Sequence, residues 1–104
     1  NERRNVMLET LEEHMPPGVS WTRPEGGLFL WLTLPEGINS TVLFKVAVKR
    51  KVAFVPGEAF HPRGGGENTM RLNFSSSTPD KINEGIARLG MAIREIMQKT
   101  PISP

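Results

Sequence analysis

Apolar residues recur with helical spacing at both ends of the chain. In residues 3–15, Leu8, Leu11 and Met15 are separated by three and four positions, which is typical of the buried stripe of an amphipathic helix. Near the other end, the same spacing runs through Ile82, Ile86, Leu89, Ile93 and Ile96. The sequence Thr-Pro-Asp at 78–80 supplies an N-cap, a proline for the first helical position and an acid that suits the helix dipole. A helix is therefore predicted at each end.

Between these helices, shorter apolar segments predict β-strands. The segments are 19–22, 28–34, 52–55 and 69–74. In 28–34, leucines occupy one face and the aromatic residues Phe29 and Trp31 the other. A strand that is apolar on both faces is usually central and covered on both sides. We expect one of these covers to belong to another domain or subunit.

The segment 41–51 fits either a helix or a strand. Its valines favour a strand, whereas Leu43 and Ala47 keep helical spacing. Asn39 or Ser40, immediately before it, can act as a helix N-cap. We therefore predict a helix here, and a long loop in residues 56–68.

The predicted order of elements is α-β-β-α-β-β-α. This order indicates an α+β fold, a small two-layer sandwich with helices on one face of a largely antiparallel sheet. A length of 104 residues suits one small domain. We expect the domain to span 1–99, with a disordered tail at 100–104. Because the chain begins almost inside a helix, we expect a fragment of a longer polypeptide.

Composition excludes several classes of function. Thirteen basic and eleven acidic residues leave a net charge of +2, too small to indicate binding to nucleic acid or to an anionic membrane. The absence of cysteine excludes disulfides, zinc thiolates and thiol catalysis, and it is compatible with a cytoplasmic protein. The longest apolar run, 28–34, is too short to span a bilayer. No nucleic-acid or membrane partner is expected.

The chain lacks the usual motifs of a self-sufficient active site. His14 and His61 stand far apart, so no histidine pair has metal-binding spacing, and no metal is expected. The Arg-Gly-Gly-Gly run at 63–66 precedes no helix start and is more simply a loop than a phosphate cradle. With these motifs absent, Arg71 is the most informative candidate for a functional residue.

Arg71 stands in the middle of a short, half-buried strand, between Met70 and Leu72. One interpretation is structural, since a carboxylate such as Glu67 could pair with it or its stem could reach the edge of the sheet. The other is functional, because a guanidinium binds a planar carboxylate through two parallel hydrogen bonds. The residue pattern alone leaves both interpretations open.

Three segments resemble, in order and spacing, the C-terminal small domain of fold-type I, pyridoxal-phosphate-dependent aminotransferases. They are PEGGLFLWLTLPEG, VAFVPGEAF and NTMRLNFSSSTPDKINEGIARLGMAI. The similarity spans about residues 4–97 and is greatest to the 2-aminoadipate/kynurenine and aromatic aminotransferase group. It implies that Arg71 binds the α-carboxylate of an amino acid that exchanges its amino group with a 2-oxo acid. It also implies that Phe29 lines the substrate pocket.

In this family, the residues that hold pyridoxal 5'-phosphate lie in the large domain. The Schiff-base lysine has no counterpart here, so the resemblance implies a chain that alone neither binds the cofactor nor catalyses. The full-length protein is expected to be a homodimer in which the missing large domain completes the site. Two alternatives remain, an aminotransferase-like effector domain of a transcription regulator and a stand-alone α+β binding module.

Overall fold

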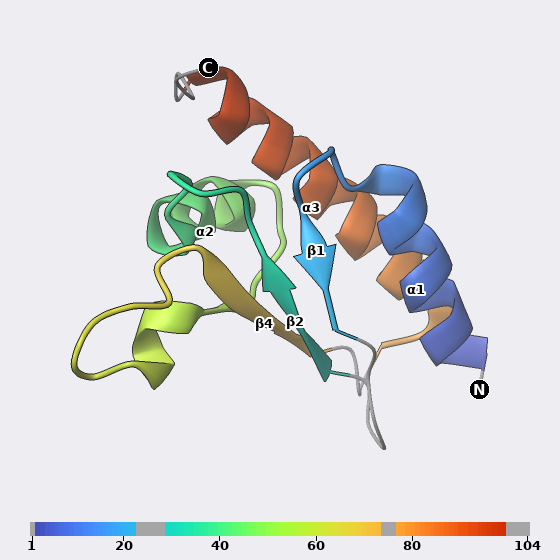
Figure 1. Cartoon of the computed structure of the whole chain (residues 1–104). Helices are drawn as coiled ribbons and strands as arrows, with labels where there is room; N and C mark the ends of the chain where they lie inside the picture. The colour runs from blue at the N-terminus through green and yellow to red at the C-terminus, as the bar shows by residue number, and fades with distance from the viewer. Residues whose placement is uncertain (1, 23–28, 74–76, 100–104) are drawn as a thin grey trace.

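A computed structural model describes residues 2–22, 29–73 and 77–99, apart from the side chain of Phe29. The described part contains eight elements (Figure 1): α1 (Glu2–His14), β1 (Ser20–Trp21), β2 (Phe29–Thr33), α2 (Ser40–Lys49), β3 (Val55–Pro56), the 3-10 helix η1 (Gly57–Phe60), β4 (Thr69–Asn73) and α3 (Pro79–Lys99). The tail expected at 100–104 lies outside the described residues.

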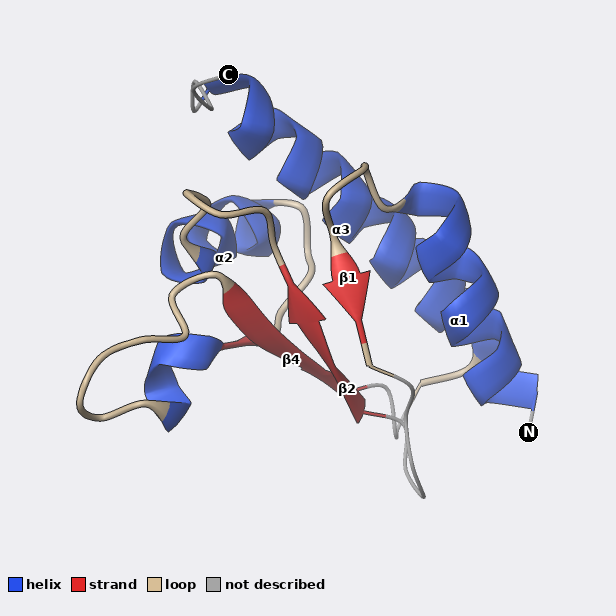
Figure 2. Cartoon of the chain, viewed as in Figure 1, coloured by secondary structure: helices blue, strands red, loops and turns tan. Residues whose placement is uncertain are grey.

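The four strands form one antiparallel sheet in the order β1-β2-β4-β3 (Figure 2). The strands β2 and β4 are central and pair over their full lengths, with Leu30 opposite Leu72 and Trp31 opposite Arg71. The prediction of an α+β fold with a small antiparallel sheet is confirmed.

The hydrophobic core lies between one face of the sheet and the three α-helices. Leu30 and Leu32 of β2 and Met70 and Leu72 of β4 alternate onto this face and are almost fully buried. The helices complete the core with Met7, Leu11, Leu43, Ala47, Ile82, Ile86, Leu89, Ala92, Ile93 and Ile96. Trp31, on the opposite face of β2, is only half-buried. Within the described residues, the helices therefore pack on one face of the sheet.

The ambiguous segment after β2 forms a helix, as predicted. The Asn39 side chain caps α2, because its Oδ1 accepts hydrogen bonds from the backbone N atoms of Thr41 at 2.8 Å and Val42 at 3.2 Å. Asn39 rather than Ser40 is thus the cap. Similarly, Thr78 Oγ1 accepts a hydrogen bond from the backbone N of Lys81 at 3.3 Å, as expected for the N-cap of α3.

Two predictions about the region after α2 are wrong. Residues 52–54 do not form a strand. The strand in this region, β3, begins only at Val55, and it pairs with β4 at Val55 and Pro56. Val52 and Phe54 are buried in the core without joining the ladder, and an edge strand tolerates the missing N–H of Pro56. The loop predicted at 56–68 also contains η1. The other elements match their predicted bounds within one or two residues, and residues 28 and 74 lie outside the described part.

The packing of α1 on α3 depends on a close approach at Gly90. A Cβ atom added to Gly90 would lie 2.6 Å from the carbonyl oxygen of His14, at the end of α1. His14 is thus a half-buried residue at a helix–helix contact. Any side chain at position 90 would push the two helices apart.

We expect Gly90→Ala to lower the free energy of unfolding by about 1–3 kcal/mol, because overpacking outweighs the better helix propensity of alanine. Gly85→Ala is the matched control, since Gly85 lies on the same helix and lines a surface pocket with Lys51, Lys81, Glu84 and Arg88. The control should raise stability by up to about 1 kcal/mol. Urea denaturation checks both values, and equal effects of the two changes would contradict the packing argument.

The Glu95 carboxylate joins the end of α2 to α3. Arg50 Nη2 donates a hydrogen bond to Glu95 Oε1 at 2.7 Å, and Lys99 Nζ lies 3.5 Å from Glu95 Oε2. The hydrogen bond from Arg50, followed by the charge of Lys99, holds the pKa of Glu95 below its ordinary value. Because the folded state favours the ionised form, this contribution to stability is present above the ordinary carboxyl range and is lost as the pH falls through the lowered pKa.

We therefore expect Glu95→Gln to lower the melting temperature at neutral pH, and the difference from the unsubstituted chain to shrink as the pH falls through the lowered pKa. Thermal unfolding followed by circular dichroism across this range measures the effect. Glu12→Gln, at an exposed position of α1, is the control for removing one negative charge. If the difference in melting temperature between Glu95→Gln and the unsubstituted chain does not change with pH, the ionisation of Glu95 contributes nothing to stability.

Candidate functional site

Arg71 lies on the face of the sheet opposite to the helices. In the register of the sheet, Arg71 of β4 is directly opposite Trp31 on β2 and Val55 on β3. Directly opposed residues of antiparallel strands project to the same face, so these three side chains form a row across three strands. All three are half-buried. The register thus places a cation among apolar side chains on the sheet face opposite to the described helices.

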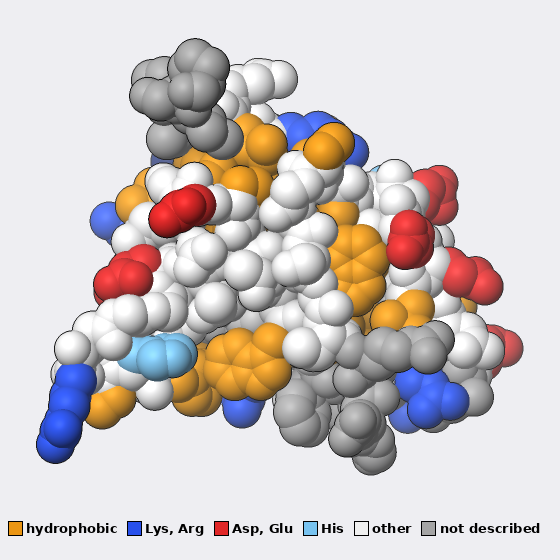
Figure 3. All heavy atoms as spheres, in the orientation of Figure 1, with side chains coloured by type: hydrophobic (Ala, Val, Ile, Leu, Met, Phe, Trp, Pro, Cys, Tyr) orange, Lys and Arg blue, Asp and Glu red, His pale blue; other side chains and the backbone are white. Residues whose placement is uncertain are grey.

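Phe60, the last residue of η1, lies against this row. The Cζ atom of Arg71 is 5.1 Å from the centroid of the Phe60 ring, and the rings of Phe60 and Trp31 meet edge to face at 4.9 Å. Both distances fall within the ranges of favourable cation–π and aromatic contacts. Trp31, Val55, Phe60 and Arg71 are called the Arg71 cluster below. Figure 3 shows one face of the molecule, on which hydrophobic side chains reach the surface in separate patches.

The backbone around η1 holds Phe60 in this place. A Cβ atom at Gly57 would overlap Oγ1 of Thr69 and lie 2.5 Å from the carbonyl oxygen of Gly66, so only glycine fits the first position of η1. The Thr69 hydroxyl donates a hydrogen bond to the Gly66 carbonyl at 2.8 Å. His61 Nδ1 lies 2.8 Å from the Gly57 carbonyl oxygen. These contacts tie the η1 loop to the first residue of β4, two positions before Arg71.

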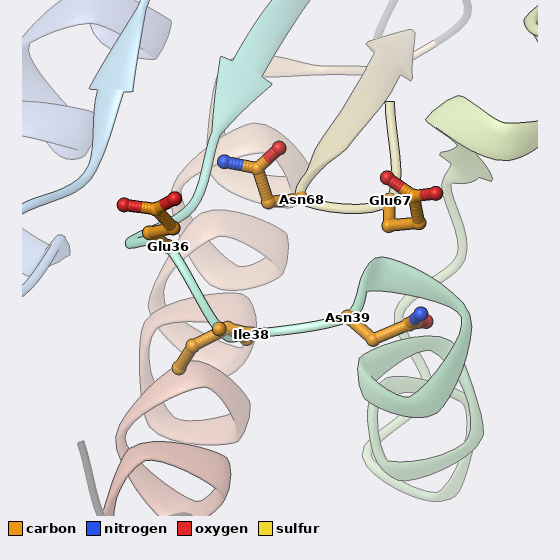
Figure 4. Close-up of a pocket in the computed structure, with 6 residues that line it drawn as sticks. Glu36, Ile38, Asn39, Glu67 and Asn68 are labelled. Atoms are coloured by element: carbon orange, nitrogen blue, oxygen red, sulfur yellow. The ribbon is translucent and has the colours of Figure 1, made fainter. Parts of the chain in front are cut away.

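A separate pocket of about 490 Å³ lies between the loop after β2 and the residues before β4. Its lining consists of Glu36, Gly37, Ile38, Asn39, Glu67 and Asn68, and Figure 4 shows the labelled side chains around it. This lining contains two carboxylates and no basic residue, so the pocket does not suit an anionic ligand. The sequence analysis missed this pocket, although Glu36 and Glu67 flank the paired ends of β2 and β4.

The structure also shows where the backbone of Phe29 and the side chain of Glu67 lie. The backbone of Phe29 pairs with Asn73, and its side chain lies outside the described part. Glu67, the proposed structural partner of Arg71, has a carboxylate oxygen that accepts a hydrogen bond from the backbone N of Gly65 at 3.2 Å. Phe60 was not predicted as a site residue, because nothing in its local sequence indicates a contact with a residue eleven positions later.

The described ranges contain no group of three or more His, Asp or Glu side chains that could hold a metal ion. In the same ranges, no helix combines the length and the apolar composition that a membrane-spanning segment requires. The Arg71 cluster is therefore the best-defined candidate site in the described residues. Its chemistry, a guanidinium set among apolar groups, suits a carboxylate or another small anion.

The described residues define an α+β domain with a half-buried arginine on the sheet face opposite to its helices. The chain belongs to the aminotransferase class I and II family, whose sequence model matches residues 1–89. The membership agrees with the resemblance carried by the three segments quoted above.

Individual relatives support the same assignment. The chain is 55% identical over 97 residues to aromatic-amino-acid aminotransferase 1 of Thermococcus litoralis, covering 93% of this chain and 23% of that protein. It matches the crystal structure of LysN, an α-aminoadipate aminotransferase from Thermus thermophilus complexed with N-(5'-phosphopyridoxyl)-L-leucine, with a TM-score of 0.90 and 41% identity. That match covers 95% of this chain and 25% of LysN. The chain thus spans about a quarter of the length of these two relatives.

The chain is also similar to a protein with a different description. An uncharacterized HTH-type transcriptional regulator of Bacillus subtilis, YdfD, is 27% identical over 97 residues, covering 93% of this chain and 20% of that protein. The identity is about half of that to the Thermococcus litoralis enzyme.

The Arg71 cluster contains no lysine that could serve a pyridoxal phosphate site. Such a site needs a lysine that reaches the cofactor aldehyde. All five lysines of the chain are exposed, and they lie on α2, directly after it, or on α3: Lys45, Lys49, Lys51, Lys81 and Lys99. The Arg71 cluster, by contrast, is built from β2, β3, η1 and β4.

Proposed function

We propose that this chain is the C-terminal small domain, residues 1–99, of a pyridoxal-phosphate-dependent aminotransferase. The whole protein would transfer an amino group between an amino acid and a 2-oxo acid, and Arg71 would bind the α-carboxylate of the substrate. The observation that carries the proposal is the position of Arg71, half-buried among apolar groups on the sheet face that the helices leave open. The family membership supports it.

A guanidinium in this setting suits the proposed task. Two parallel N–H···O bonds would fix both the position and the orientation of a carboxylate. Holding the carboxylate sets the direction of the neighbouring Cα–H bond, which is the bond that transamination breaks, so Arg71 would act by positioning. It would also give selectivity, because an amine that lacks the carboxylate would leave a partly desolvated cation without its ligand.

The remainder of the protein would supply the other half of the site. Pyridoxal 5'-phosphate would provide the electron sink for breaking the Cα–H bond, and it would be held by a larger domain that covers the face of the sheet carrying Arg71. Phe29, which the resemblance places in the substrate pocket, would line that site from β2. We propose a homodimeric, cytoplasmic enzyme, and a 104-residue chain that is inactive alone.

A second candidate function is an effector domain of a transcription regulator. The 27% identity to the Bacillus subtilis regulator favours it, and such a protein would use the same fold to sense pyridoxal phosphate or an amine. The higher identity to aminotransferases makes the enzyme the better-supported proposal. A DNA-binding helix-turn-helix in the parent polypeptide would favour the regulator.

Replacing Arg71 in the full-length protein tests the proposed role. We expect Arg71→Ala to lower kcat/KM for amino acids, because a charge-assisted bidentate contact is lost. The decrease should correspond to a loss of about 2–5 kcal/mol in transition-state stabilisation. Arg71→Lys should recover only part of the loss, since an ammonium cannot form the planar pair of hydrogen bonds. Steady-state kinetics with L-phenylalanine as amino donor measures both.

Arg63→Ala is the matched control, because Arg63 is exposed in the loop between η1 and β4 and lies outside the Arg71 cluster. It should leave kcat/KM unchanged. If Arg71→Ala also leaves kcat/KM unchanged while the enzyme remains active and folded, the assignment of Arg71 as the carboxylate-binding group is wrong.

A further inference from the structure

Phe60 is an apolar side chain in an unusual place. It is 40% exposed, although it belongs to a short 3-10 helix whose first residue, Gly57, is buried. Among the described residues, its ring lies close to the guanidinium of Arg71 and to the edge-to-face ring of Trp31. Both neighbours lie on the uncovered face of the sheet. The place of this ring therefore needs an explanation other than burial in the core.

The contact between the Phe60 ring and Arg71 provides that explanation. An aromatic face attracts a cation electrostatically, and a distance of 5.1 Å from Cζ to the ring centroid is within the favourable range. A phenyl ring also carries no oxygen that would compete with a carboxylate for the guanidinium. The Phe60 ring can therefore restrict the motion of the Arg71 side chain and leave its positive charge in place, whereas an acidic neighbour would neutralise that charge.

The ring is supported by contacts with neighbouring segments. Trp31 supports it from the adjacent strand at 4.9 Å with an interplanar angle of 77°. The Gly57 carbonyl oxygen lies 2.8 Å from His61 Nδ1, and Gly57 itself packs against Thr69 at the start of β4. The ring thus reaches Arg71 from a backbone segment that is attached to the same strand as Arg71.

We propose that Phe60 is a positioning residue for Arg71, and that it fixes the guanidinium in the orientation that binds the substrate carboxylate. This inference rests on the proposed function, in which Arg71 binds that carboxylate. It assigns Phe60 a part in carboxylate recognition through Arg71 rather than a contact with the substrate side chain. Trp31 supports the ring from its edge.

Two probes with the same phenyl group separate these roles in the full-length protein. 3-Phenylpropionate carries the carboxylate and no amine, and 2-phenylethylamine carries the amine and no carboxylate. We expect Phe60→Leu to weaken binding of 3-phenylpropionate by about 3- to 30-fold, the range that loss of a cation–π contact implies. Binding of 2-phenylethylamine should not change. Isothermal titration calorimetry measures both without turnover.

Two further variants serve as controls. Phe60→Tyr keeps an aromatic face over the guanidinium, so it should bind 3-phenylpropionate more tightly than Phe60→Leu does. Phe44→Leu removes the ring from another edge-to-face pair, that of Phe44 and Phe54, whose centroids are 5.4 Å apart in a different part of the fold. It should leave the affinity for both probes unchanged, which controls for a general effect of losing an aromatic pair.

The Arg71→Ala background distinguishes this inference from the proposed function. If Phe60 acts through Arg71, adding Phe60→Leu to Arg71→Ala should cause no further loss of affinity for 3-phenylpropionate. An equal loss with both probes, or a full additional loss in the Arg71→Ala background, overturns the positioning role and leaves the proposed function intact. If Arg71→Ala alone has no effect on 3-phenylpropionate, both the proposed function and this inference fail.

Discussion

The register between β2 and β4 decides which side chains enter the core and which lie on the opposite face of the sheet. In the observed register, Leu30 faces Leu72 in the core, and Trp31 faces Arg71 on the other side of the sheet. Strand side chains alternate with a period of two, so a slip of one residue would turn Arg71 into the core. A buried, unpaired guanidinium there would be far more costly than the loss of a few contacts. The hydrophobic core thus selects the face on which Arg71 is displayed.

This division of the sheet into two faces links stability to function. The helices α1, α2 and α3 bury one face and supply most of the core. The other face carries the row of Trp31, Val55 and Arg71, with the Phe60 ring beside it. Apolar side chains such as Trp31 and Val55 on the face opposite to the helices suit a domain that meets a further surface. The chain spans about a quarter of the length of the two aminotransferases described above, which agrees with this view.

Local sequence patterns predicted those features that depend on neighbouring residues. The periodicity of the isoleucines predicted α3, and the cap at Asn39 correctly favoured a helix for α2 over the strand that its valines suggested. The alternation of Met70 and Leu72 around Arg71 predicted the strand β4. The strand predicted at 52–55 failed because burial of Val52 and Phe54 comes from core packing rather than from sheet pairing. The contact of Phe60 with Arg71 could not be predicted, because it depends on how η1 folds back over β4.

We propose that Arg71, on the sheet face opposite to the helices, binds the α-carboxylate of the substrate. A crystal structure of the full-length protein with a bound substrate analogue, such as 3-phenylpropionate, tests it most directly. We expect two hydrogen bonds of about 2.7–2.9 Å between the Arg71 guanidinium and the two carboxylate oxygens, with the Phe60 ring still against the guanidinium. A carboxylate bound elsewhere, with Arg71 paired to an acidic side chain of the protein, would contradict it.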